Sequence, residues 1–141
     1  MIDAAGRTAV YSGAQVRGER GEAQGRDCAA IANIVRSDAV PRAMVEKFEQ
    51  SPDLPLAQRL VDALAAGEAA GGEKVPVTSA ALIVVDRESF PYVDLRVDDH
   101  ATPIAELARL WAAYRPEADA YVVRAVDPER AVPPGMAAGK T

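Results

Sequence analysis

The chain has 141 residues, of which 49% are hydrophobic and 26% are charged. This length suits one domain with a hydrophobic core and is short for two domains that each have a sizeable core. The formal net charge of -5 argues against a basic surface that binds the phosphates of a nucleic acid, and only two Phe and one Trp are available to stack on bases. The longest strongly apolar run, residues 80–85, is too short to cross a bilayer, and no signal peptide is recognisable. We therefore expect a soluble, cytoplasmic protein with no nucleic-acid or membrane partner.

The N-terminus is predicted to form a hairpin. An apolar stub at Met1 and Ile2 is followed by turn residues 3–6 and by an extended segment at residues 8–11. Residues 17–27 then contain three glycines and six charges without periodicity, which is typical of a solvated loop.

Residues 28–35 form a short apolar run that ends in Asn-Ile-Val, and this pattern favours a buried strand over a helix. The run begins with Cys28, the one cysteine of the chain, so the sequence excludes an internal disulfide and a cysteine-based metal cluster. A small buried residue is a better interpretation of this cysteine than a nucleophile.

Two helices are predicted after this strand. In the first, Ser37 or Asp38 can cap the N-terminus, and Pro41 lies in the first turn, where its missing N–H costs little. The second begins near Pro55 and ends at a glycine pair, residues 71–72, because glycine can adopt the left-handed conformation there. The apolar residues at helical spacing are Val40, Met44 and Phe48 in the first helix and Leu56, Leu60, Val61 and Leu64 in the second.

A second pair of strands follows. Residues 79–86 are a continuous apolar run with a β-branched end, which predicts a strand covered on both faces. After a turn at residues 87–91, residues 92–97 alternate apolar and polar side chains. We therefore expect them to pair antiparallel with the preceding strand and to expose one face to water.

Thr102 can cap the last predicted helix, and Pro103 occupies its first position. Its apolar side consists of Ile104, Leu107, Leu110, Trp111 and Tyr114. We expect one domain over residues 1–114 and a proline-rich arm over residues 115–141 that is ordered only where it docks. The resulting order β-β-β-α-α-β-β-α implies an α+β fold with layered sheets covered by helices.

Several stretches resemble a known family: DAAGRTAVYSG near the start, PRAMVEKFE and PLAQRLVDALAAGEAAGG in the helices, SAALIVV, and the long motif VDLRVDDHATPIAELARL. From Met1 to about Leu110 the chain is similar to the C-terminal part of domain of unknown function 1028. That family is similar in fold to the N-terminal-nucleophile (Ntn) hydrolases, whose αββα sandwich has two antiparallel sheets between helical layers. The resemblance implies an incomplete half of such a sandwich, with the N-terminal strands missing.

Family members carry a Thr or Ser close to their start, and this sequence has no counterpart to that segment. In an Ntn hydrolase the side chain of the first residue attacks an amide carbonyl while its own α-amine acts as the base. Met1 offers only a thioether, and the bulky Ile2 keeps an initiator methionine in place. The resemblance therefore implies a subunit of an amidohydrolase that cleaves an amide bond of a small molecule without a cofactor. We expect a partner chain to supply the nucleophile, so that this chain is not catalytic alone.

Two other hypotheses belong to different classes. One is a non-catalytic domain of the same fold that binds a small molecule or scaffolds a partner, including a second copy of this chain. The other is a decayed reading frame whose product has no independent role. A neighbouring reading frame that holds the missing strands and begins with Thr, Ser or Cys would favour the two-chain enzyme.

Asn33, at the end of a predicted strand, is the best candidate for an oxyanion or substrate contact, because its amide can donate two hydrogen bonds. A turn-capping role is the plainer interpretation of this residue. Ser79 can bond to a nucleophile or substrate of a partner chain, or more simply to the backbone at a strand end. Gly71 and Gly72 can allow a ligand to approach the backbone closely, although helix termination explains both.

Asp98, Asp99 and His100 are the one cluster of carboxylates and imidazole in the sequence. Successive residues of a strand point to opposite faces, so at most two of the three can share a metal ion. A cluster at the start of the helix, or an ion pair with Arg96, is the preferred interpretation. A Ser-His-Asp triad is permitted by composition but lacks the glycine pattern of a nucleophile elbow. Its members would be Ser79, His100 and Asp94.

Overall fold

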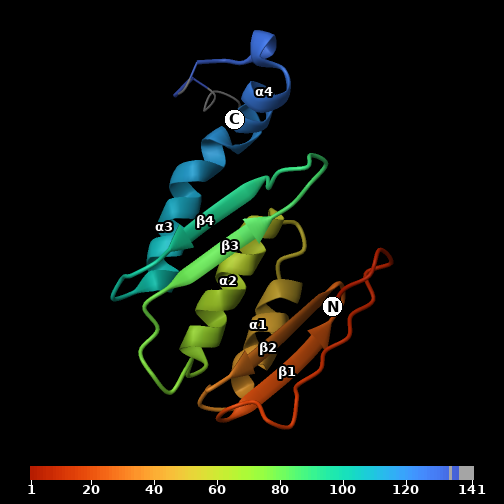
Figure 1. Ribbon diagram of the computed structural model, residues 1–141, viewed down its shortest axis with the longest axis vertical. Coiled ribbons are helices and arrows are strands. Elements are labelled where there is room, and N and C mark those ends of the chain that lie inside the picture. Colours follow the sequence, from red (N-terminus) through yellow and green to blue (C-terminus); the bar gives the residue numbers. More distant parts are fainter. Residues whose placement is uncertain (134, 137–141) are drawn as a thin grey trace. The chain divides into compact units, whose positions relative to one another are not determined.

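The structure of the chain is a computed structural model that describes residues 1–133, 135 and 136. It contains two compact units, Met1–Thr78 and Ser79–Thr141, and each is described by itself (Figure 1). Within the described residues, each unit has one two-stranded antiparallel sheet and two α-helices. The α+β class predicted from the sequence is therefore confirmed.

The predicted N-terminal hairpin is present in a minimal form. A single antiparallel bridge joins Ile2 to Thr8. The carboxylate of Asp3 closes the turn, because it accepts the backbone N–H of Ala5 at 2.9 Å and that of Arg7 at 3.0 Å. The turn is thus of the Asx kind, in which a side chain replaces a backbone acceptor.

The expectation of a loop at residues 17–27 is wrong, because strand β1 occupies Arg20–Gly25. Its charged side chains are exposed, whereas Gly21 on the opposite face is buried. A Cβ atom at this glycine would lie 2.8 Å from Cγ of Pro41 in the next helix. The glycines that suggested a loop are therefore residues that let a helix lie directly on the strand.

Strand β2 (Cys28–Asn33) confirms the strand predicted at residues 28–35 and pairs antiparallel with β1. The paired residues run from Arg20 and Asn33 at one end to Gly25 and Cys28 at the other. The strand is not buried as expected, since Ala30 is buried but Ile31 on the outer face is 64% exposed. The N-terminal segment contacts this outer face at β1, where Thr8 donates to Gln24 at 3.1 Å and Ser12 donates to Glu22 at 2.9 Å, but the face remains exposed at Ile31.

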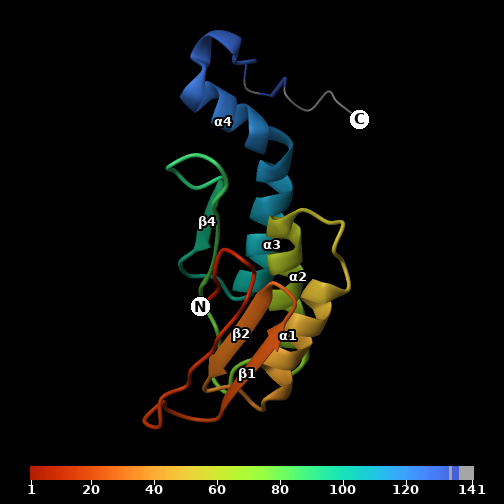
Figure 2. The same cartoon turned by 90° about the vertical axis from the view of Figure 1, so that its right-hand side faces the viewer.

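Both helices predicted after this strand are confirmed, α1 as Ala39–Glu49 and α2 as Leu56–Ala69. The two helices pack against each other, and α1 also covers the inner face of the β1–β2 sheet (Figure 2). Arg59 of α2 links the helices by donating two hydrogen bonds, of 3.1 and 2.9 Å, to the carbonyl oxygen of Phe48. Its guanidinium also lies 3.7 Å over the Phe48 ring. Arg59 therefore satisfies a carbonyl in the last turn of α1 that has no partner within the helix.

The apolar face predicted for α2 is correct only in part. Val61 is buried, but Leu56 is 46% exposed. The buried residues of α2 are Ala57, Val61, Ala63 and Gly67. Gly67 lies against the side chain of Met44 in α1. The leucine spacing located the helix, whereas small residues make much of its buried face and let α1 approach closely.

In the second unit, β3 (Ala80–Val84) and β4 (Val93–Val97) form the predicted antiparallel pair. The inner face of this sheet carries the buried residues Leu82, Val84, Val93 and Val97. On the outer side of β3, Ile83 is 61% exposed, and the following Val85 is 70% exposed. The expectation that residues 79–86 are covered on both faces is therefore wrong for the described chain.

Helix α3 (Pro103–Tyr114) confirms the last predicted helix and covers the inner face of the β3–β4 sheet (Figure 2). Leu107 and Trp111 are its most buried side chains, at 0% and 2% exposure. Pro103 occupies the first helical position as predicted. Thr102 stands at the N-cap, but its side chain makes no capping hydrogen bond to the helix.

The segment predicted as an arm contains further helical structure. A 3-10 turn at Arg115–Glu117 leads into helix α4 (Ala118–Val126), and a second 3-10 turn follows at Pro128–Arg130. The proline in the first turn separates α4 from α3, because proline lacks the N–H that an uninterrupted helix needs. Positions 134 and 137–141 of the arm lie outside the described residues. None of the described helices is long and apolar enough to span a membrane.

The packing of α3 yields a stability prediction. Leu107→Ala should lower the free energy of unfolding of the second unit by about 2–5 kcal/mol, because it leaves a cavity beneath α3. Fluorescence of Trp111, the one tryptophan of the chain, reports this transition during urea unfolding. Leu110→Ala, at a half-buried site on the same helix, is the matched control and should cost clearly less. Equal losses for the two variants would show that Leu107 does not anchor the helix.

Candidate functional site

Asn33 is the last residue of β2, and its side chain is exposed. The next residue, Ile34, has a φ of +58°, a left-handed conformation that is rare for a β-branched residue. A second segment holds it there, because the backbone N–H of Lys74 donates to the Ile34 carbonyl at 2.8 Å. We call residues 33–35 the β2 elbow. Backbone strain of this kind is frequent at functional sites, and here it lies directly beside the Asn33 amide.

Gly71 and Gly72 end helix α2 beside the β2 elbow. Both have positive φ values, of 123° and 57°, which explains why glycine occupies these positions. The carbonyl of Gly72 accepts the N–H of Arg36 at 3.1 Å, and Glu73 forms an isolated bridge with Val35. The structure therefore brings the glycine pair next to the elbow, although helix termination accounts for the conformation of both glycines.

Ser79 directly precedes β3 in the second unit, and its side chain is exposed. Asp94 lies in β4, on the outer face opposite Ile83, and is exposed as well. Within the part of the chain that the structure describes, no hydrogen bond joins Ser79, His100 and Asp94. The structure therefore does not assemble these three residues into a triad.

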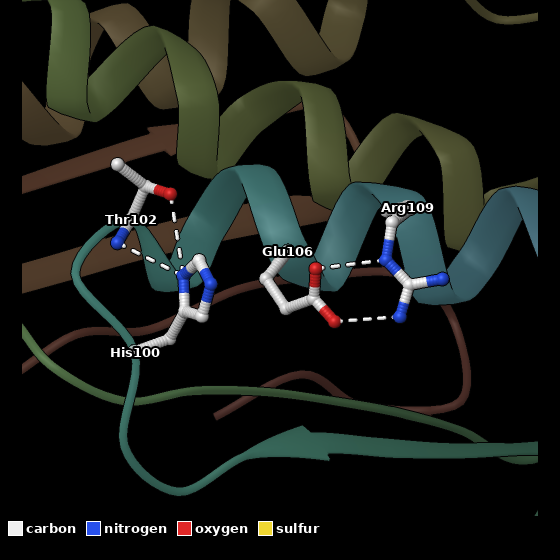
Figure 3. A network of polar contacts seen from close by, with 4 residues as sticks. All are labelled: His100, Thr102, Glu106 and Arg109. Atoms are coloured by element: carbon white, nitrogen blue, oxygen red, sulfur yellow. Dashed lines mark hydrogen bonds and ion pairs between the residues drawn. The ribbon is translucent and has the colours of Figure 1, made fainter.

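Asp98 and His100 are both engaged near the start of α3. Arg96 donates two hydrogen bonds, of 2.6 and 3.0 Å, to Oδ1 of Asp98. Nδ1 of His100 accepts the backbone N–H of Thr102 at 3.0 Å (Figure 3). Asp99 is exposed. Among the described residues, no group of three His, Cys, Asp or Glu side chains is arranged to hold a metal ion.

Figure 3 also shows an ion pair on the surface of α3. Arg109 donates two hydrogen bonds, of 2.8 and 2.6 Å, to the carboxylate of Glu106. These bonds hold the pKa of Glu106 below its usual range and raise the pKa of Arg109. Each of these two side chains neutralises the charge of the other, which favours a structural role over a catalytic one for both.

Cys28 has the properties of a structural residue. Its thiol is half-buried. Burial raises the pKa of Cys28, and the nearby carboxylate of Glu49 raises it further. A thiol with a raised pKa stays protonated near neutral pH and is therefore a weak nucleophile.

A cluster of tyrosines, which the sequence analysis missed, lies in the second unit. Tyr92 donates its hydroxyl to Oδ1 of Asp119 in α4 at 2.9 Å. Tyr114, the last residue of α3, donates its hydroxyl to the backbone carbonyl of Tyr92 at 3.2 Å. The ring of Tyr114 stacks in parallel on that of Tyr121, with centroids 5.4 Å apart. This tyrosine cluster ties α4 to the chain at the start of β4.

An ion pair with little exposure extends the tyrosine cluster. Arg124 donates to Oε2 of Glu117 at 2.8 Å, and the two side chains are only 19% and 17% exposed. The guanidinium of Arg124 also lies 4.8 Å from the ring centroid of Tyr121. Glu117 and Arg124 are seven residues apart, as are Tyr114 and Tyr121, and the 3-10 turn between α3 and α4 brings the members of each pair into contact. That spacing was the signal in the sequence, but the proline between α3 and α4 concealed it.

A pocket of about 190 Å3 opens beside the tyrosine cluster. It lies between α4 and the loop that joins β3 to β4. Its lining residues are Asp86, Arg87, Glu88, Phe90, Tyr92 and Val122. Three charged, two aromatic and one aliphatic side chain thus line one small concave site.

The sequence matches a known family over most of its length. The model of a family of unknown function, DUF1028, matches residues 1–107. The chain belongs to this family. The resemblance inferred from the sequence motifs is therefore confirmed at the level of the family. The match ends inside α3, so α4 lies outside the matched DUF1028 region.

The DUF1028 chain is also similar to a solved structure, the crystal structure of protein SPO2555 from Silicibacter pomeroyi, which is described as a DUF1028 protein. The TM-score is 0.70 and the sequence identity is 32%. The alignment covers 80% of this chain and 48% of the Silicibacter protein, so this chain spans about half the length of that relative. No curated protein matches this chain.

The tyrosine cluster gives a prediction about pH. Burial raises the pKa of Tyr92 from 10.0 to about 12, and the hydrogen bond to Asp119 adds to the shift. Since the folded chain favours the neutral phenol, this contribution to stability is complete below pH 10 and is lost as the pH rises toward 12. The urea midpoint of the second unit, followed by Trp111 fluorescence, should therefore fall more steeply over this range in the unsubstituted chain than in Tyr92→Phe.

Tyr11→Phe is the control for this measurement, because Tyr11 is 87% exposed. It should keep the slope of the unsubstituted chain. A fall that is equally steep in Tyr92→Phe would assign the pH dependence to other groups.

Proposed function

We propose that this DUF1028 chain is one part of an Ntn-type amidohydrolase that cleaves an amide bond of a small molecule. The chain contributes half of an αββα sandwich and the groups that contact substrate, and a partner chain contributes the remaining strands and the nucleophile. The observation that carries the proposal is that each two-stranded sheet has a helix on one face and exposed apolar side chains on the other.

The open faces are apolar at several positions. Ile31 in the first unit is 64% exposed, and Ile83 and Val85 in the second are 61% and 70% exposed. Each sheet has two strands within the described part of the chain, and two-stranded sheets are marginally stable without further strands or cover. In an αββα sandwich each sheet has helices on one face and the other sheet on its second face. A half of such a sandwich therefore has helices on one side of each sheet and leaves apolar side chains exposed on the other side.

Asn33 supports the chemical part of the proposal. Acyl transfer needs hydrogen-bond donors at the oxygen that gains negative charge, and an asparagine amide supplies two N–H groups. The amide of Asn33 is exposed at the end of β2, and the elbow after it is held by the Lys74 hydrogen bond. In the proposed enzyme, Asn33 is an oxyanion donor, Ser79 contacts the nucleophile or the substrate, and Gly71 and Gly72 allow the substrate to approach the backbone.

The nucleophile is assigned to the partner because the candidates in this chain are poor. The raised pKa of Cys28 disfavours the thiolate. Ser79 has no hydrogen-bonded base among the described residues. Ntn chemistry places the nucleophile and its base on one terminal residue. A Thr, Ser or Cys at the start of the partner chain would satisfy both requirements at once.

Covalent labelling tests this proposal. The chain is co-purified with the half of the Silicibacter protein that it does not cover, and the complex is treated with a β-lactone, an electrophile that acylates activated hydroxyl and thiol groups. Intact-mass measurement of the separated chains should place the adduct on the first residue of the partner. Asn33→Ala should slow labelling by about a hundredfold if its amide is an oxyanion donor. Ser79→Ala should have a similar but smaller effect.

Gln50→Ala is the matched control, because it removes an exposed side-chain amide at the end of α1. Its labelling rate should equal that of the unsubstituted complex. A stoichiometric adduct at Cys28 or Ser79 would overturn the Ntn assignment. A stable complex that forms no adduct on either chain would favour the non-catalytic binding domain.

A further inference from the structure

Two walls of the pocket beside the tyrosine cluster, Tyr92 and Val122, are held by contacts within the second unit. On one side, Tyr92 is held by its hydroxyl to Asp119 and by its backbone carbonyl to Tyr114. On the other side, Val122 projects from α4, which the ring stack of Tyr114 on Tyr121 fastens to the end of α3. These contacts hold Tyr92 and Val122 in place, and walls that the fold already holds reduce the cost of binding.

Three charges line the pocket and are not paired with one another. Asp86, Arg87 and Glu88 are exposed, and none of them forms an ion pair with another residue that the structure describes. A ligand that satisfies all three lining charges must carry both signs. Its ammonium group would meet the two carboxylates, and its carboxylate would meet the planar guanidinium.

The remaining walls are apolar or aromatic. Phe90, Tyr92 and Val122 are all half-buried. The two rings can contact an aliphatic body and can also face an ammonium group, which aromatic rings attract. The volume of about 190 Å3 is below the range that drug-sized ligands need, so the occupant must be small.

We propose that this pocket binds a small zwitterion of the free amino acid class, with an ammonium group, a carboxylate and an apolar side chain. The inference does not rest on the proposed amidohydrolase function, because it concerns a pocket formed entirely within the second unit. Val122 and the Asp119 that holds Tyr92 both lie beyond residue 107, where the DUF1028 match ends. The pocket is therefore completed by a segment outside the family match.

Equilibrium dialysis with radiolabelled L-leucine tests the proposal, because it works in any oligomeric state of the full chain. Leucine should bind saturably with a dissociation constant in the millimolar range, as expected for a small ligand held by exposed charges. Two competitors separate the charges: leucinamide lacks the carboxylate, and N-acetylleucine lacks the ammonium group. Each should compete about fivefold more weakly than leucine.

Charge variants identify which lining residues bind the ammonium group of the ligand and which bind its carboxylate. Arg87→Gln should weaken leucine about fivefold and leave leucinamide unchanged. The double variant Asp86→Asn with Glu88→Gln should weaken leucine and leucinamide but not N-acetylleucine. Asp53→Asn removes an exposed carboxylate in the first unit and is the matched control, which should bind like the unsubstituted chain. Trp111 fluorescence verifies that each variant is folded.

Val122→Trp tests the location independently of charge, because the larger side chain fills the pocket from α4. It should abolish saturable leucine binding. Leucine uptake that is not saturable would overturn the proposal. So would equal affinities for leucine, leucinamide and N-acetylleucine, or leucine binding that persists unchanged in Val122→Trp.

Discussion

A two-stranded sheet with a helix on only one face exposes the side chains of its second face to solvent. This constraint applies to both units of the chain. In the first unit α1 covers β1 and β2, and Ile31 faces outward; in the second α3 covers β3 and β4, and Ile83 faces outward. Exposed apolar faces and open strand edges favour association with further strands. The proposal of a partner is therefore supported by the exposed apolar side chains of the sheets themselves.

The packing of α1 and α2 in the first unit positions the candidate site. Helix α1 lies directly on the strands at Gly21, and Arg59 fixes α2 to the last turn of α1. The end of α2 then returns the chain to the β2 elbow, where Lys74 bonds to the left-handed Ile34. The position of Asn33 is thus set by helix packing as well as by its own strand. A substitution between α1 and α2 is expected to disturb the site although it touches no site residue.

The sequence predicted most helices and strands because their signals were local. Proline and glycine bounded α2, alternation revealed β4, and Pro103 located the start of α3. Strand β1 was missed because its glycines serve contact with a helix that is distant in sequence, which a local reading cannot detect. The outward positions of Ile31 and Ile83 were missed for a related reason, since an apolar side chain does not reveal which face will be covered.

The candidate site could be predicted less well than the fold. The family was recognisable from long motifs, and the residues that directly follow Asn33 do pair with the segment that contains Gly72. The sequence analysis missed the tyrosine cluster because Tyr92 and Asp119, which are distant in sequence, come into contact only in the folded chain. It missed the pocket for the same reason, since Tyr92 is one of the lining residues.

The central claim is that this chain completes its sheets with a partner, and sedimentation velocity tests it most directly. The chain alone should sediment as self-paired or aggregated species, and addition of the half of the Silicibacter protein that it does not cover should convert these to a defined one-to-one complex. A stable monomer that unfolds cooperatively and does not bind the added half would contradict the account. It would show that the exposed faces of the two sheets need no further strands.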